Sequence, residues 1–209
     1  MLKEGAIESA LFLLAHSPKR FRITSLFVLS IIPKTVQKHA IRKEVCYYLS
    51  DFFSQFYLRF VRGKTGIDEH FWSNSAQSPA RRAYEGIAFE FICLGHLSQI
   101  RESLSIGGVL SESFCWKISE DGTYPGAQVD LIISRKDNTE TLCEMIFTEG
   151  LFAIDKNYEA VLRNKITRYM DFTKRRKNFQ LVLITTFGLS RNIYSNIVSK
   201  TLVLDDLFR

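Results

Sequence analysis

Two acidic residues, Asp130 and Glu144, each lie within an apolar stretch of the sequence. The stretches are rich in β-branched residues, and a short polar turn at Asp137-Asn138 separates them, which predicts two adjacent core strands. A carboxylate on a core strand is costly to bury unless an opposite charge pairs with it or a ligand binds to it. Both acids are therefore candidate functional residues.

The spacing of these acids resembles the PD-(D/E)XK nucleases. Gly126-Ala-Gln-Val-Asp130 is followed on the next predicted strand by Glu144-Met-Ile146. The resemblance implies that Asp130 and Glu144 hold Mg²⁺ and that a lysine two residues after the glutamate helps to activate water. That position is Ile146 in this chain. Since residues i and i+2 share a strand face, Ile146 would face the site without a charge.

The elements around these strands predict an α/β fold. The chain order is a long helix, three strands, a helix and two further strands, expected at 80–102, 109–118, the two strands above, 155–176, 180–186 and 201–204. This order matches a PD-(D/E)XK core, a mixed central sheet flanked by helices. Within the long helix Glu90 is an unusual acid among apolar neighbours. Cys93 and His96 could share a metal, but a buried thiol and a capped imidazole are the simpler interpretation.

Further segments resemble the C-terminal half of a family of prokaryotic AAA-type ATPases. The resemblance covers residues 45–209 well and 1–44 loosely, and it is carried by Phe71-Trp72, Ala88-Phe89-Glu90, Pro125–Asp130, Leu142–Met145, Ile154-Asp155-Lys156, Thr185–Gly188 and Leu204–Phe208. It implies a winged helix followed by a PD-(D/E)XK nuclease-like domain, with Glu90, Asp130 and Glu144 as metal-site acids. Lys156 is the nearest candidate for a displaced catalytic lysine. The sequence has no Gly-x-x-x-x-Gly-Lys-Ser/Thr loop, so we expect no ATPase activity.

The N-terminal part is predicted to be a small, mostly helical, winged-helix-like domain over 1–62, joined by a linker at 63–79 to the nuclease-like domain at 80–209. It includes a short helix expected at 23–30. Residues 1–78 hold 11 Lys/Arg and 6 Asp/Glu, an excess of +5 within a formal net charge of +6. An anionic partner is therefore expected there, with four polar side chains against DNA: Lys34, Thr35, Gln37 and Lys38. A packing module between domains remains an equal alternative.

Composition favours a cytoplasmic protein that does not enter membranes. The four cysteines are far apart and lack metal-ligand spacing. The apolar run at 23–32 is too short to span a bilayer.

Three functional hypotheses follow from the sequence. The first is a degenerate nuclease-like module that binds nucleic acid, with DNA favoured, or a protein partner, with weak or no catalysis because Ile146 replaces the lysine. The second is an active Mg²⁺-dependent nuclease. The third is a regulatory or interaction domain for a separate ATPase. Mg²⁺ is the cofactor expected if the carboxylate site is intact.

Overall fold

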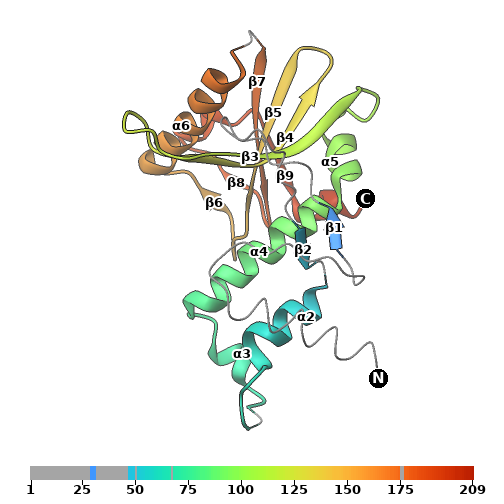
Figure 1. Ribbon diagram of the computed structural model, residues 1–209, viewed down its shortest axis with the longest axis vertical. Helices are drawn as coiled ribbons and strands as arrows, with labels where there is room; N and C mark the ends of the chain where they lie inside the picture. The colour runs from blue at the N-terminus through green and yellow to red at the C-terminus, as the bar shows by residue number, and fades with distance from the viewer. Residues whose placement is uncertain (1–28, 32–46, 50, 67, 175–176) are drawn as a thin grey trace.

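The computed structural model describes residues 29–31, 47–49, 51–66, 68–174 and 177–209 (Figure 1). Its centre is a five-stranded sheet of order β3-β4-β5-β7-β9. These strands are Ser111–Ile118, Ala127–Arg135, Thr139–Ile146, Asn178–Thr185 and Lys200–Val203. Strands β3, β4 and β5 are antiparallel neighbours, whereas β7 runs parallel to β5 and β9 parallel to β7. The predicted α/β class and mixed central sheet flanked by helices are confirmed.

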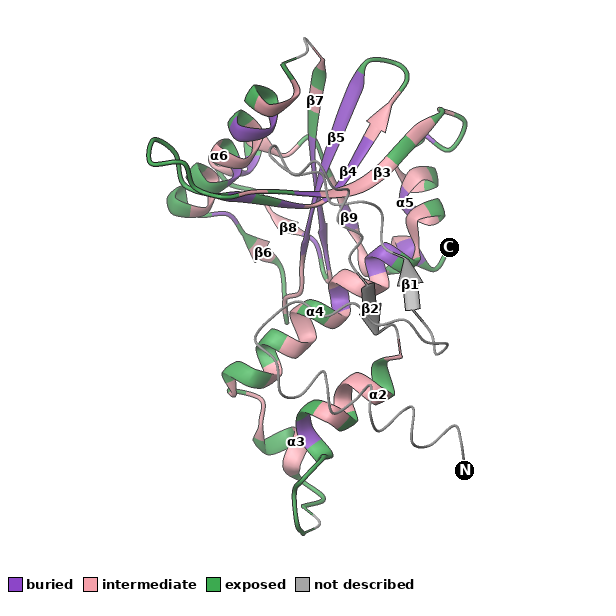
Figure 2. Ribbon diagram, in the orientation of Figure 1, coloured by how far each residue is buried: buried purple, intermediate pink, exposed green. Residues whose placement is uncertain are grey.

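Helices cover both faces of the sheet (Figure 1). Helices α4 (Pro79–Gly95) and α5 (Leu97–Ser103) pack on one face, and α6 (Lys156–Thr173) packs on the other. The strands between them are the most buried elements (Figure 2). On the α4 side the core includes Phe89, Cys93, Ile100, Leu131, Ile133, Cys143, Val182 and Ile184. On the α6 side it includes Trp116, Val129, Ile132, Leu142, Leu162, Tyr169 and Leu181.

Local sequence signals fix the ends of the main elements. Asp155 caps α6, since its Oδ1 accepts a hydrogen bond from Tyr158 N–H at 2.7 Å. The helix ends at Lys174, which has a left-handed φ of 51°. The turn between β4 and β5 contains Asn138 at φ 64°, a conformation that asparagine tolerates better than most residues. The two adjacent strands predicted on either side of the Asp137-Asn138 turn are therefore confirmed.

The long helix predicted over 80–102 is two helices that meet at His96. This residue has ψ 36° and its N–H bonds to Cys93 O. Its ring Nδ1 lies 2.8 Å from Ile92 O, so the side chain takes part in ending the helix. Gly95, a poor helix former, precedes it. The second helix, α5, then contacts the C-terminal turn η3 (Leu204–Leu207) through Ser103 Oγ, which donates to Asp206 O at 3.2 Å.

The described N-terminal part contains an antiparallel pair, β1 (Leu29–Ile31) and β2 (Tyr47–Leu49). The predicted helix at 23–30 is wrong at its last two residues, because pairing with β2 keeps them extended. Asp51 caps α2 (Phe52–Phe56) and accepts a hydrogen bond from Ser54 N–H at 2.8 Å. The π-helical turn η1 (Tyr57–Val61) continues from α2.

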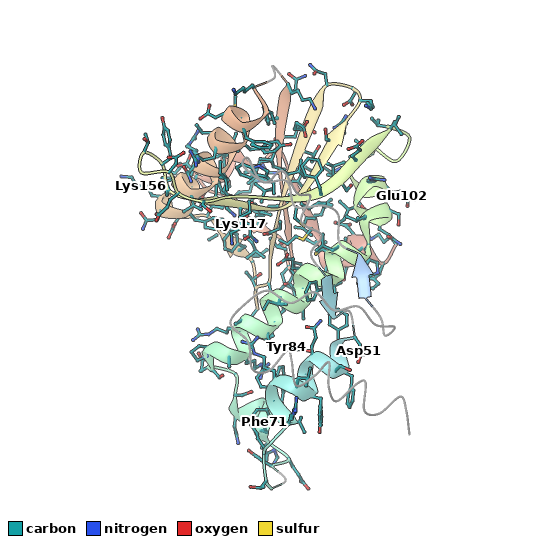
Figure 3. The ribbon with its side chains drawn as sticks, viewed as in Figure 1. Asp51, Phe71, Tyr84, Glu102, Lys117 and Lys156 are labelled. Carbon is teal, nitrogen blue, oxygen red and sulfur yellow. The ribbon has the colours of Figure 1, made fainter. Side chains whose placement is uncertain are left out.

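Five rings form an aromatic cluster that joins this part to α4: Phe56, Phe60, Phe71, Trp72 and Tyr84. Two of them come from α3 (Phe71–Asn74), inside the segment predicted to be a linker. Arg81 of α4 lies 4.1 Å above the Trp72 ring, and Tyr84 OH donates to Phe52 O at 3.3 Å. Figure 3 shows Phe71 and Tyr84 on this lower side of the molecule.

Short elements complete the described chain. A small parallel sheet pairs β6 (Phe152–Ala153) with β8 (Leu189–Ser190), and the turn η2 (Ser195–Ile197) precedes β9. No helix in the described ranges is long and apolar enough to cross a membrane.

Candidate functional site

The central strands β4 and β5 separate where the candidate acids lie. Their ladder of backbone pairs ends at Leu131 and Cys143. Beyond this point Met145 N–H donates to Asp130 Oδ2 at 3.0 Å. The Asp130 carboxylate thus satisfies a β5 donor just past the end of the ladder and holds the two strands together at their point of divergence.

A bulge in β4 positions Asp130. On β3, Phe114 pairs with Ile132 of β4. Two residues further along β3, Trp116 pairs with Val129, which lies three residues back along β4. Asp130 is therefore one of two β4 residues that face a single residue of β3. A bulge of this kind changes the direction of a side chain and is common beside active sites.

Glu144 is the most deeply buried of the candidate acids, with 3% of its surface exposed. Its Oε2 accepts a hydrogen bond from Lys165 Nζ of α6. Its Oε1 is buried and has no hydrogen-bond partner among the described residues. One oxygen of this carboxylate is thus paired and the other is without a partner, which is unusual for a buried charged group.

A second buried glutamate on the same strand provides an internal comparison. Glu140, four residues before Glu144 on β5, is 2% exposed. Its Oε1 accepts from Lys177 Nζ and, at 2.9 Å, from Ser134 Oγ. Its Oε2 accepts from Tyr169 OH at 3.2 Å. Both oxygens of Glu140 have protein partners, so this pair is complete, whereas the pair at Glu144 is not.

Glu90 of α4 joins Asp130 and Glu144 in one electrostatic group. Burial raises the pKa of Glu90 to about 7, and the charge of Asp130 adds to the shift. Burial raises the pKa of Glu144 to about 8; Asp130 adds to this shift and the Lys165 ammonium opposes it. Burial also raises the pKa of Asp130, although the Met145 N–H and Lys165 act against it. Burial is thus the main cause of the raised pKa of all three acids, and the negative charge of Asp130 adds to the shifts of Glu90 and Glu144.

Other residues named from the sequence lie outside this group or outside the described structure. Lys156 is exposed at the first residue of α6 (Figure 3). Ile146 ends β5 opposite Thr185 of β7. The four residues expected to contact DNA (Lys34, Thr35, Gln37 and Lys38) and most of the predicted 1–62 domain lie outside the described residues. The nucleic-acid contact and the domain boundaries therefore remain predictions.

Lys165 is the residue of this site that the sequence analysis missed. A signal for it exists in the helix period. Tyr158, Leu162, Lys165 and Tyr169 recur at spacings of four, three and four residues, so they share one face of α6. Leu162 and Tyr169 on that face are buried in the core. A lysine within a buried helical stripe requires an acidic partner on the packed sheet, and Glu144 is that partner.

Two of the three acids have the donor chemistry of ligands for a divalent cation that retains several waters. Carboxylate oxygens are hard ligands of the kind that Mg²⁺ prefers, and Mg²⁺ is commonly held by only one or two carboxylates. The buried Glu144 Oε1 without a partner is the atom best placed to accept it. In the part of the chain that the structure describes, no three His, Cys, Asp or Glu side chains gather as ligands of one ion. The candidate ligands are thus limited to the two carboxylates of Asp130 and Glu144, with which Glu90 interacts electrostatically.

Comparisons with models of known protein families, with curated proteins and with solved structures find no match to this chain. The resemblances to AAA-type ATPases and to PD-(D/E)XK nucleases thus stay predictions from the residues quoted above.

Replacing Glu90 with glutamine should remove part of the pH dependence of stability. The pKa of Glu90 is about 7 in the folded protein against 4.5 for an unperturbed glutamate, so the folded state binds more protons between these pH values. The free energy of unfolding therefore falls as pH rises through this window. Because Glu90 is only partly buried, we expect Glu90→Gln to be about 1–3 kcal/mol more stable than the wild type at pH 8, and equal to it near pH 4.5. Urea denaturation at both pH values, without divalent cations, measures the difference. If the free energy of unfolding had the same pH dependence in the two proteins, the pKa of Glu90 would not be raised in the folded state.

Proposed function

We propose that this chain carries a nuclease-like site of the PD-(D/E)XK type, which binds nucleic-acid phosphodiesters with a divalent cation and hydrolyses them slowly. The observation that carries the proposal is the pair of acids just past the end of the β4–β5 pairing, a buried Glu144 and a half-buried Asp130. One carboxylate oxygen of this pair, Glu144 Oε1, has no partner among the described residues. A buried acid left in this condition destabilises the fold unless it serves a ligand.

Each side chain has a defined task in this proposal. Asp130 and Glu144 would hold the cation, and the Met145 N–H that binds Asp130 Oδ2 keeps that carboxylate oriented. The chemistry that Mg²⁺ supplies when bound is polarisation of the phosphodiester and a lower pKa for water. Glu90 would add a third negative charge that offsets the charge of the bound cation. Ile146 offers neither charge nor hydrogen bond, which is the reason to expect slow turnover.

The basic N-terminal third supports nucleic acid as the partner. The excess of +5 over residues 1–78 provides an attractive potential for phosphates. In the same proposal this region is a winged-helix-like domain that contacts the nucleic acid through residues 34–38.

The test measures cation binding and hydrolysis separately. Calorimetry with Mn²⁺ should show one saturable site in the wild type and none in Asp130→Asn. Cleavage of single- and double-stranded DNA and RNA in Mn²⁺ or Mg²⁺ should fall at least about 10²-fold in Asp130→Asn and in Glu144→Gln. The matched control is Glu102→Gln on α5, because Glu102 is an exposed glutamate (Figure 3). A wild type that binds no Mn²⁺, or cleavage that survives Asp130→Asn, would exclude the site.

A second candidate function is a regulatory or interaction module without catalysis. The observation that favours it is the Lys165 ammonium, which compensates part of the charge of Glu144 without a metal ion. Cation binding without cleavage of any substrate, together with retained nucleic-acid or protein binding, would select this function.

A further inference from the structure

The ammonium of Lys165 lies at Glu144 although position 146 of the same strand carries no charge. We propose that Lys165, reaching the site from α6, replaces the cationic side chain that β5 lacks, and acts on the attacking water and the phosphate during hydrolysis. This inference rests on the proposed function and assigns one of its working groups.

The position of Lys165 suits this role. Its side chain is 18% exposed, so the ammonium lies between a buried carboxylate and the outside of the protein. It occupies only Oε2 of Glu144 and leaves Oε1 for a cation. The lysine and a cation therefore bind different oxygens of one carboxylate and do not exclude each other. In this arrangement Glu144 links the ammonium to the ligand site.

Neutralisation of a buried acid does not account for the pair by itself. Lys177 has a similar exposure, 14%, and pairs with Glu140 four residues earlier on β5. There Ser134 and Tyr169 complete the hydrogen bonds of the carboxylate. No described residue completes those of Glu144. Among the described residues, β5 thus carries one glutamate whose carboxylate has a full set of partners, Glu140, and one whose carboxylate does not, Glu144, and the latter interacts with Asp130.

The reaction consumes one water molecule. The water oxygen forms a new bond to phosphorus, the bond from phosphorus to the leaving sugar oxygen breaks, and one proton from the water ends on that oxygen. Lys165 remains an ammonium throughout, donating hydrogen bonds to Glu144 and to the attacking water. Its charge also stabilises the negative charge that develops on the phosphate oxygens.

Relocating the charge tests this role. Lys165→Met removes the ammonium and keeps most of the side-chain volume; hydrolysis should fall about 10²–10³-fold. Mn²⁺ affinity measured by calorimetry should rise about tenfold or more, because a repelling charge has gone. The double variant Lys165→Met/Ile146→Lys should recover at least about tenfold of the lost hydrolysis, since it returns a lysine to the same carboxylate from the strand. Ile146→Lys alone should gain little.

Lys177→Met is the matched control, because it removes the other lysine paired with a β5 glutamate. All rates are compared per folded molecule, with the folded fraction taken from circular dichroism, and Lys165→Gln serves if the methionine variant does not fold. Hydrolysis by Lys177→Met should stay within about threefold of the wild type, well short of the 10²-fold change expected at Lys165. Equal rates in Lys165→Met and Lys177→Met, with Mn²⁺ affinity unchanged, would show that Lys165 is only a structural counter-ion.

Failure of the inference differs from failure of the proposed function. If the wild type cleaves nucleic acid and Asp130→Asn does not, but Lys165→Met cleaves normally, the site is correct and the role of Lys165 is wrong. If the wild type neither binds Mn²⁺ nor cleaves, the proposed function is wrong and the role of Lys165 is rejected with it.

Discussion

Replacing Lys177 with methionine should lower the free energy of unfolding by about 3–5 kcal/mol, because it leaves the buried Glu140 without its ion pair. Glu140 is 2% exposed and cannot recover water in the folded state. The hydrogen bonds from Ser134 and Tyr169 remain, but neither brings a positive charge. Urea denaturation at pH 7 measures the loss directly.

The control for this prediction is the double variant Glu140→Gln/Lys177→Met. Without the carboxylate there is no buried charge to leave unpaired, so the double variant should be more stable than Lys177→Met alone. A loss below about 1 kcal/mol in Lys177→Met would mean that the pair behaves as an exposed one.

Trp116→Ala should destabilise the protein by a similar amount, about 3–5 kcal/mol. Trp116 is 0% exposed and lies on β3 at the bulge that positions Asp130. Its ring centroid lies 5.2 Å from that of Tyr169 and 5.7 Å from that of Phe172, both on α6. Removing the indole opens a large cavity between the sheet and the helix that carries Lys165. Thermal or urea unfolding followed by circular dichroism gives the value.

Trp116→Phe separates packing from hydrogen bonding at this position. The indole Nε1 is buried and has no hydrogen-bond partner among the described residues. Phenylalanine removes that unsatisfied donor and keeps most of the ring contacts, so we expect a loss of less than about 1.5 kcal/mol. If the phenylalanine variant were as unstable as Trp116→Ala, the stabilising contribution would come from the indole nitrogen and not from the ring contacts.

Much of the sheet could be predicted from residue pattern. Strands β4 and β5 each contain a short apolar segment, Leu131–Ile133 in β4 and Leu142-Cys143 in β5, and their turn carries asparagine where a left-handed φ is needed. The start of helix α6 is indicated by its capping residue, Asp155. These signals are local, so a single sequence contains them. The break of the long helix at His96 was not predicted, because it depends on a contact between the ring and a carbonyl one turn earlier.

The site was predicted only in part, because a single sequence shows local signals but not contacts between distant segments. Asp130 and Glu144 stand out because an acid within an apolar run is locally anomalous. The bulge at Asp130 depends on pairing with β3, and the partner of Glu144 comes from a helix 21 residues away along the chain. Neither relation follows from spacing within one element. The sequence directed attention to Ile146, whereas the ammonium at Glu144 comes from Lys165.

Helix α4 connects two regions that otherwise have little in common. Tyr84 belongs to the aromatic cluster and Glu90 to the group of acids, and they lie on one unbroken helix about 9 Å apart along its axis. Because the helix is continuous between them, we expect a partner that displaces α4 at the aromatic cluster to shift the Glu90 carboxylate relative to Asp130 as well. Such mechanical coupling is reciprocal: whatever stabilises one position of Glu90 also stabilises one packing of the rings. Glu90, the one acid of the group that lies on α4, is therefore joined through this helix to the mostly half-buried rings of the aromatic cluster.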